Sequence, residues 1–266
     1  MRIPLLVSLA LLSALLIGCG GSSGTTTPVV PSSPYPNLAG NWTLTADSNV
    51  TGAQYQLGGY MTNTGASVTA TFHVYPFAES NCYPSEEEIP FTGTVTTSGA
   101  ISLTSGSVAN QTITMAGSIS GGSSFTATYE IAGGCAAGDA GLVLASAEPS
   151  YTGDYTGTLQ PLSGSDVNVS VNMVQSGPNA GGEYSVSGTA QFSGTSCFTT
   201  GTITSSTIFG EYVQFAMSTD NGGAGEFIGA AINIPGSTTI GGEFQVTAGS
   251  CAGNGYGVSI GNTSST

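Results

Sequence analysis

The sequence has almost no positive charge. Its 266 residues include one Lys or Arg, which is Arg2, and one histidine, His73, against 15 acidic residues. Proteins that bind nucleic acid neutralise phosphates with Lys and Arg, so this composition excludes nucleic acid as a partner. Side-chain ion pairs are equally scarce, because only His73 could pair with the acids after the N-terminus. A folded domain must therefore depend on apolar burial, backbone hydrogen bonds and covalent links.

Charge of either sign is scarce, at 6% of residues, whereas 39% are apolar. That apolar fraction is too high for a disordered chain, and the 41 glycines show no Gly-X-Y period, which excludes collagen. No segment after residue 18 has the spacing of apolar residues typical of a helix. The length allows one large β domain or two small domains.

The N-terminus has the features of an export signal. Arg2 is followed by an apolar run, Ile3–Ile17, which is shorter than the roughly 20 residues that span a bilayer. The run ends in Leu16-Ile17-Gly18-Cys19, which resembles the lipobox of bacterial lipoproteins. The resemblance implies a signal peptide over residues 1–18, cleavage before Cys19, and fatty acylation of Cys19. Gly20, in place of Asp, implies the outer membrane of a bacterial envelope.

Residues 19–36 are predicted to tether the folded part of the chain to the membrane. They mix Gly, Ser, Thr and Pro and show no apolar period. Cleavage would remove Arg2 and leave a chain without Lys or Arg. We therefore expect the membrane to be a partner through the lipid anchor only. The sequence leaves the oligomeric state open.

The remaining sequence is an internal repeat. Leu38–Thr43 resembles Tyr151–Thr156, and the cysteines fall at similar places in the two halves. The repeat predicts two domains, at residues 37–148 and 149–262, followed by a tail at 263–266.

Four cysteines remain once Cys19 is assigned to the anchor, and they allow three connectivities. The repeat favours Cys82–Cys135 and Cys197–Cys251, because each unit then carries its own bridge. Export to an oxidising compartment permits disulfides. The alternative is metal binding by four thiols, but the sequence has no C-x-x-C and one histidine, so zinc fits poorly.

Each repeat is predicted to consist of antiparallel strands. Val, Thr, Tyr and Phe alternate with polar residues, and Gly, Asn and Pro clusters separate the alternating runs. The second unit has eight predicted strands, near residues 153–159, 167–174, 183–192, 199–205, 207–217, 225–234, 238–248 and 256–260. The fold is therefore expected to be all-β, with two tandem eight-stranded meander barrels or sandwiches. The first unit has an insertion near Pro76–Pro90.

Gly40-Asn41-Trp42 resembles the G-x-W motif that opens lipocalin-like (calycin-like) barrels. The resemblance implies barrel topology. The second unit departs from it, because Tyr155 replaces the Trp, and the basic residue and C-terminal helix of lipocalins are absent.

The sequence offers little for catalysis. His73 alternates with Phe72 and Val74, which predicts a solvent-facing position on a strand. The acidic residues Glu130 and Glu243 are expected on exposed strand positions. We therefore predict no catalytic residues, no metal site, no cofactor and no enzyme activity.

The insertion is the predicted ligand site, because it distinguishes the two units and such loops often carry function. The candidate ligand-binding residues are Tyr75, Phe77, Tyr83, Glu86, Glu87 and Glu88. The predicted function is a non-catalytic, lipid-anchored surface protein that binds a small apolar ligand or a glycan. A structural or assembly component of the envelope is the alternative, and a glycan-acting hydrolase is a remote one.

Overall fold

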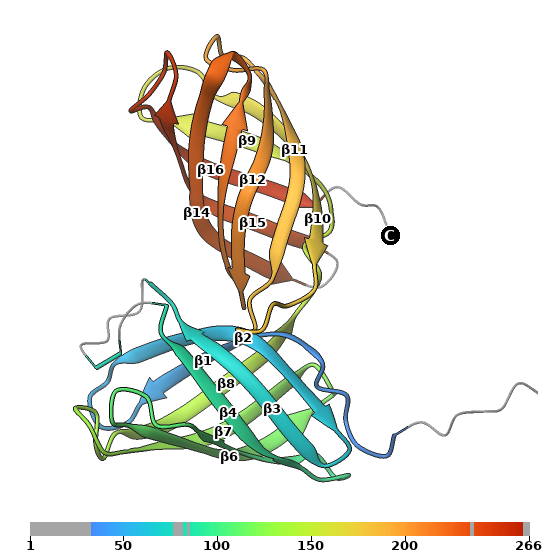
Figure 1. Cartoon of the computed structure of the whole chain (residues 1–266), viewed down its shortest axis with the longest axis vertical. Coiled ribbons are helices and arrows are strands. Elements are labelled where there is room, and N and C mark those ends of the chain that lie inside the picture. The colour runs from blue at the N-terminus through green and yellow to red at the C-terminus, as the bar shows by residue number, and fades with distance from the viewer. Residues whose placement is uncertain (1–32, 77–81, 84–85, 235–236, 263–266) are drawn as a thin grey trace, which may run out of the picture. The chain divides into compact units, whose positions relative to one another are not determined.

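Two closed antiparallel β-barrels make up the described part of the chain (Figure 1). The structure is a computed structural model that describes residues 33–76, 82–83, 86–234 and 237–262. The predicted signal peptide, Cys19, most of the tether, Phe77 and the tail lie outside the described residues. No helix within the described ranges is long and apolar enough to cross a membrane.

Barrel 1 is formed by the first repeat. Its strands, in chain order, are β1 (Gly40–Ser48), β2 (Gln54–Thr64), β3 (Ser67–Val74), β4 (Glu88–Val95), β5 (Ala100–Ser105), β6 (Thr112–Ser120), β7 (Ser124–Ala132) and β8 (Ala140–Glu148). Each strand pairs with the next, and β1 pairs with β8 to close the sheet. Closure removes the exposed edges that a Thr-rich sheet with little charge would otherwise present.

Barrel 2 repeats this topology. Its strands are β9 (Gly153–Pro161), β10 (Val167–Ser176), β11 (Ser185–Ser193), β12 (Thr200–Phe209), β13 (Tyr212–Thr219), β14 (Gly223–Ile234), β15 (Ser237–Ala248) and β16 (Gly255–Asn262). The pairing of β16 with β9 closes it. The all-β prediction of two eight-stranded meanders is confirmed, and both are closed barrels, not sandwiches.

Period-two alternation builds both cores. In β7 the odd-numbered residues from Phe125 to Ile131 are buried, and the even-numbered residues between them are exposed. Trp42, from the G-x-W motif, is 1% exposed, and its Nε1 donates a hydrogen bond to the Leu38 carbonyl at 2.9 Å. Tyr155 takes the corresponding buried place in barrel 2.

One predicted strand boundary is wrong. The sequence suggests a break near residue 206, but β12 continues to Phe209 and the turn follows at Gly210 and Glu211. The cause is a β-bulge: Ile203 pairs with Met217 while Ser205 pairs with Ala216, so one residue is extra. The bulge shifts the alternation by one position, so that Ile203 and Ile208 are both buried.

Both predicted disulfides are present. Cys82–Cys135 joins the β3–β4 and β7–β8 connections, and Cys197–Cys251 joins the β11–β12 and β15–β16 connections. Each bridge therefore ties the same two connections of its own barrel.

The two barrels belong to one compact unit that begins at Ser33. The turn at Gly210 contacts the outward residues of β1 and the segment after β3. Asn41 exchanges two hydrogen bonds with the Gly210 backbone, and the Glu211 amide donates to the Tyr75 hydroxyl at 2.7 Å. Tyr75 also packs with Phe209 in a buried aromatic cluster. We call these contacts the junction.

Gly210 is required at this turn. Its φ is +58°, and an added Cβ would lie 2.3 Å from the Tyr75 hydroxyl. A side chain at this position would both strain the backbone and separate the junction.

Candidate functional site: the barrel lumens and barrel ends

The structure distributes the predicted ligand residues over different environments. Tyr75 is 2% exposed and lies in the junction, where burial raises the pKa of its hydroxyl. Tyr83 is buried in the core of barrel 1. Glu86 and Glu88 are exposed and Glu87 is half-buried. Among the described members of the set, only Tyr83 lines a cavity inside a barrel.

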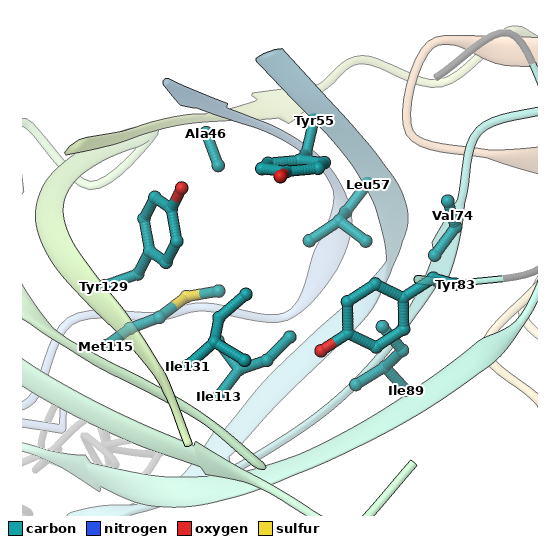
Figure 2. A pocket seen from close by; sticks show the side chains of 10 residues that line it. All are labelled: Ala46, Tyr55, Leu57, Val74, Tyr83, Ile89, Ile113, Met115, Tyr129 and Ile131. Atoms are coloured by element: carbon teal, nitrogen blue, oxygen red, sulfur yellow. The ribbon is translucent and has the colours of Figure 1, made fainter. Parts of the chain in front are cut away.

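The lumen of barrel 1 is lined by apolar and aromatic side chains from several strands (Figure 2). They are Ala46, Tyr55, Leu57, Val74, Tyr83, Ile89, Ile113, Met115, Tyr129 and Ile131. The free space is about 30 Å³, whereas one water molecule needs roughly 10–15 Å³ measured in the same way. The lumen therefore has room for about two water-sized groups.

The lumen of barrel 2 is equally full. Its free space is about 20 Å³, and its walls are apolar side chains that include Phe192, Phe215 and Phe244. Small-molecule sites usually offer about 300–1,000 Å³. Neither lumen holds a ligand of that size without movement of its side chains.

A polar cluster closes one end of barrel 1. The Asp139 carboxylate is 4% exposed and accepts hydrogen bonds from Ser48 Oγ at 2.5 Å and Tyr129 Oη at 3.3 Å. The backbone amide of Ala140 donates to the same carboxylate at 3.0 Å. The Thr51 amide donates to Ser48 Oγ at 2.9 Å, which ties the β1–β2 turn to the cluster. We call this set the closing cluster.

Tyrosines in and near the closing cluster have raised pKa values. Burial raises the pKa of Tyr129, and the negative charge of Asp139 raises it further. Burial also raises the pKa of Tyr83 to about 12. The Tyr129 phenol therefore keeps its proton at neutral pH and donates it to the Asp139 carboxylate.

Hydrogen bonds identify the counterparts of this cluster in barrel 2. The Ile131 amide donates to the Asp139 carbonyl, and the Val246 amide donates to the Asn254 carbonyl in the same way. Asn254 therefore stands where barrel 1 has Asp139, and Phe244 stands where it has Tyr129.

The strands of barrel 2 supply the other two counterparts. Ser48 lies six residues after Trp42, and Pro161 lies six residues after Tyr155. Tyr55 of β2 pairs with Ala46 of β1, and Val167 of β10 pairs with Leu159 of β9, the strand that corresponds to β1. Barrel 2 thus replaces Ser48 with Pro161 and Tyr55 with Val167, which cannot reproduce the hydrogen bonds of the closing cluster.

A cleft of about 320 Å³ lies at this end of barrel 2. Its polar lining comes from Ser163, Ser165, Thr195 and Asn254, and its apolar lining from Pro161, Leu162, Val167 and Tyr256. Pro161 and Asn254, which replace Ser48 and Asp139 of the closing cluster, line this cleft, and so does Val167, which replaces the neighbouring Tyr55. The same end is therefore closed in barrel 1 and hollow in barrel 2.

The cleft lining offers hydroxyl and amide groups beside an apolar wall. None of its lining side chains is a carboxylate or an imidazole, and Tyr256 contributes a phenol. This site was not predicted from the sequence because its residues are ordinary turn residues. The available signal was the loss of Ser48, Tyr55 and Asp139 in the second repeat.

The solvent-facing position predicted for His73 is wrong. Its side chain does point away from the core of barrel 1, but the residue is 4% exposed because barrel 2 covers it. Its Nε2 lies 2.8 Å from the Gly181 carbonyl, and its ring stacks on Phe209. Within the described ranges, no group of three or more His, Cys, Asp or Glu side chains could hold a metal ion.

Comparisons with known proteins do not assign this chain to a family. No protein-family profile matches the chain, and no curated protein matches it. Among solved structures, a protein of unknown function from the DUF3598 family of Nostoc punctiforme is similar. The identity is 10%, the TM-score is 0.24, and the match covers 87% of this chain and 99% of that chain. A likeness this distant supports no inference about ligand or activity.

Proposed function

We propose that this chain is a non-catalytic lipoprotein of the bacterial envelope that binds a small uncharged glycan at the open end of barrel 2. The cleft of about 320 Å³ in barrel 2 carries the proposal, because barrel 1 closes the same end with its own side chains. Its volume is at the lower limit for small-molecule sites, which fits a monosaccharide or a disaccharide.

The chemistry of the cleft favours a sugar over the other ligand class expected from the sequence. An apolar ligand would need space inside a lumen, and the lumens leave about 30 and 20 Å³. A sugar presents hydroxyls to groups such as Thr195 and Asn254 and an apolar ring face to Tyr256 or Leu162. The absence of carboxylate and imidazole groups from the lining supports binding without catalysis.

The lipid anchor at Cys19 is the second part of the proposal. It rests on the lipobox resemblance and on the tether that follows it. A chain without Lys or Arg after Arg2 gains nothing from anionic headgroups, so the anchor would be its attachment to the membrane.

Saturation-transfer NMR tests the binding claim. The full chain in detergent is titrated with glucose, N-acetylglucosamine and their β-1,4-linked dimers. The variant Thr195→Val with Asn254→Leu should weaken binding about tenfold or more, because each lost hydrogen bond costs about 0.5–1.5 kcal/mol. Thr128→Val, on an exposed position of barrel 1, is the matched control. Binding that is equal in both variants would place the site elsewhere.

The structural role is the second candidate, and the filled lumens together with the junction favour it. A chain that binds none of these sugars, and whose unfolding shows both barrels acting as one cooperative unit, would support a spacer or assembly component over a binding protein.

A further inference from the structure

We infer that the junction between the barrels is a proton-sensitive contact that tightens when His73 becomes an imidazolium. This inference is independent of the proposed ligand. It rests on the two carbonyl oxygens that face the His73 ring, one in each barrel.

The two ring nitrogens of His73 face acceptors. Nε2 lies 2.8 Å from the Gly181 carbonyl of barrel 2, and Nδ1 lies 3.4 Å from the Glu86 carbonyl of barrel 1. Neither carbonyl can donate a proton. A neutral imidazole carries one N–H and one lone pair, whereas the imidazolium carries two N–H groups. The site therefore satisfies the protonated ring fully and the neutral ring only in part.

The neutral ring has two tautomers, and each of them leaves one of the two contacts unfavourable. If its proton sits on Nε2, the lone pair of Nδ1 faces the oxygen of Glu86. If the proton sits on Nδ1, the short contact with Gly181 loses its hydrogen bond. Protonation removes this conflict and makes both contacts charge-assisted, which strengthens them. One of the two contacts joins the barrels, so the gain strengthens the junction.

The charged groups around His73 favour the same direction. Glu88 pairs with His73 across β3 and β4, and its carboxylate approaches Gly181. Glu86 lies on the loop before β4, and Glu183 follows Gly181 by two residues in barrel 2. The described residues contain no Lys or Arg that could oppose a positive ring.

The remaining titratable groups packed against the junction are carboxylates and phenols. Tyr75 and Tyr212 belong to the aromatic cluster that includes Phe209, on which His73 stacks. Burial raises the pKa of the carboxyl groups of Glu148 and Glu211, whose charges act on the Tyr75 hydroxyl. Protonation of either carboxyl group would also relieve the repulsion between them.

The test follows the ring and the junction separately in the full chain in detergent. Because the chain has one histidine, selective ¹⁵N-histidine labelling gives a single pair of ring signals whose shifts report protonation. Hydrogen exchange of the Gly210 amide, which donates to Asn41, reports the junction. Between a pH at which the ring signals report the neutral form and a lower pH at which they report the imidazolium, corrected protection of this amide should rise about tenfold.

His73→Gln is the decisive variant, because a glutamine can donate to Gly181 but cannot become charged. Its protection at Gly210 should change by less than about twofold over the same range. Thr69→Gln, an exposed position on the same strand, should behave like the wild-type chain. Equal pH responses in the wild-type chain and His73→Gln would overturn the inference. If that variant does not fold, the wild-type titration decides: protection that is flat or falls while the ring protonates contradicts the inference.

Discussion

Asn41 and Gly210 exchange two hydrogen bonds although 169 residues separate them. The Asn41 Nδ2 donates to the Gly210 carbonyl at 2.7 Å, and the Gly210 amide donates to Asn41 Oδ1 at 2.6 Å. Asn41 is 3% exposed, so water cannot replace either bond. A side-chain amide of β1 thus pairs with a backbone turn of barrel 2 in the way that two peptide groups pair in a sheet.

Asn41→Asp should weaken the junction. The carboxylate can still accept from the Gly210 amide, but it turns an acceptor toward the Gly210 carbonyl. The Gly210 carbonyl keeps the Tyr151 hydroxyl as a donor, whereas the buried carboxylate oxygen that faces it has no donor. Leaving a buried group unsatisfied costs about 1–3 kcal/mol, and the free energy of unfolding measured with urea should fall by that amount. Asp154→Asn, a substitution at the position equivalent to Asn41 on the exposed side of β9, is the control. A stability loss below about 0.5 kcal/mol would mean that the exchanged pair contributes nothing beyond a surface contact.

Asp139→Asn should destabilise barrel 1. Ser48, Tyr129 and the Ala140 amide all donate to this carboxylate, and an amide nitrogen cannot accept from them. We expect a loss of about 1–3 kcal/mol in the free energy of unfolding. The reverse change at the counterpart, Asn254→Asp, leaves no such donor set and serves as the comparison. A wild-type stability for Asp139→Asn would show that the closing cluster is not held together by the carboxylate.

Stability should depend on pH through Glu148. Burial raises the pKa of this carboxyl group above its usual 4.5, and it raises that of Glu211 as well, with the charge of Glu148 adding to the effect. In the window above pH 4.5 the folded chain therefore holds more protons than the unfolded chain. Stability is then highest below that window and falls as pH rises through the raised values.

Glu148→Gln should flatten this part of the curve, because the glutamine stays neutral at every pH. The free energy of unfolding, measured from pH 4.5 to pH 7, is the readout. Glu243→Gln, on an exposed position of β15, is the control and should leave the slope unchanged. A slope that Glu148→Gln leaves intact would assign the pH dependence to other groups.

Each disulfide should stabilise its own barrel. The bridges close loops with sequence separations of 53 and 54 residues, and removal of a native bridge from a small exported domain typically costs about 2–5 kcal/mol. Cys197→Ser with Cys251→Ser should therefore lower the stability of barrel 2. Near-ultraviolet circular dichroism at Trp42, which lies in barrel 1, should keep its native signal until barrel 1 itself unfolds. Loss of that signal together with barrel 2 would show that the junction couples the two.

The strands and disulfides could be predicted from the sequence because their signals are local or repeated. Alternation in segments such as Val167–Met173 requires only that one face be buried. The repeat placed Cys82 and Cys135 in the same relation as Cys197 and Cys251. The bulge between Ile203 and Ser205 could not be predicted, because an extra residue has no chemical signature of its own.

The junction and the cleft could not be predicted, for a different physical reason. His73 and Tyr75 both lie on or after the end of β3, and alternation reports only that a side chain leaves the core, not what covers it. Nothing in the residues around Gly210 indicates that this turn packs against barrel 1. The cleft depends on which side chains are missing from one end, and the sequence does not show that Pro161, Val167 and Asn254 meet there.

Mass spectrometry of the full chain, expressed in a Gram-negative host and recorded in native and denatured states, tests the central claim most directly. We predict a denatured mass for a polypeptide that begins at Cys19, with covalent acyl groups and four hydrogens fewer for the two disulfides. We also predict extra native mass, equal to one or two sugar units, when the chain is incubated with the sugars above. That extra mass should disappear in Thr195→Val with Asn254→Leu. A denatured mass that begins at Met1 without acyl groups, together with a native mass that never exceeds it, would contradict both the anchor and the binding site.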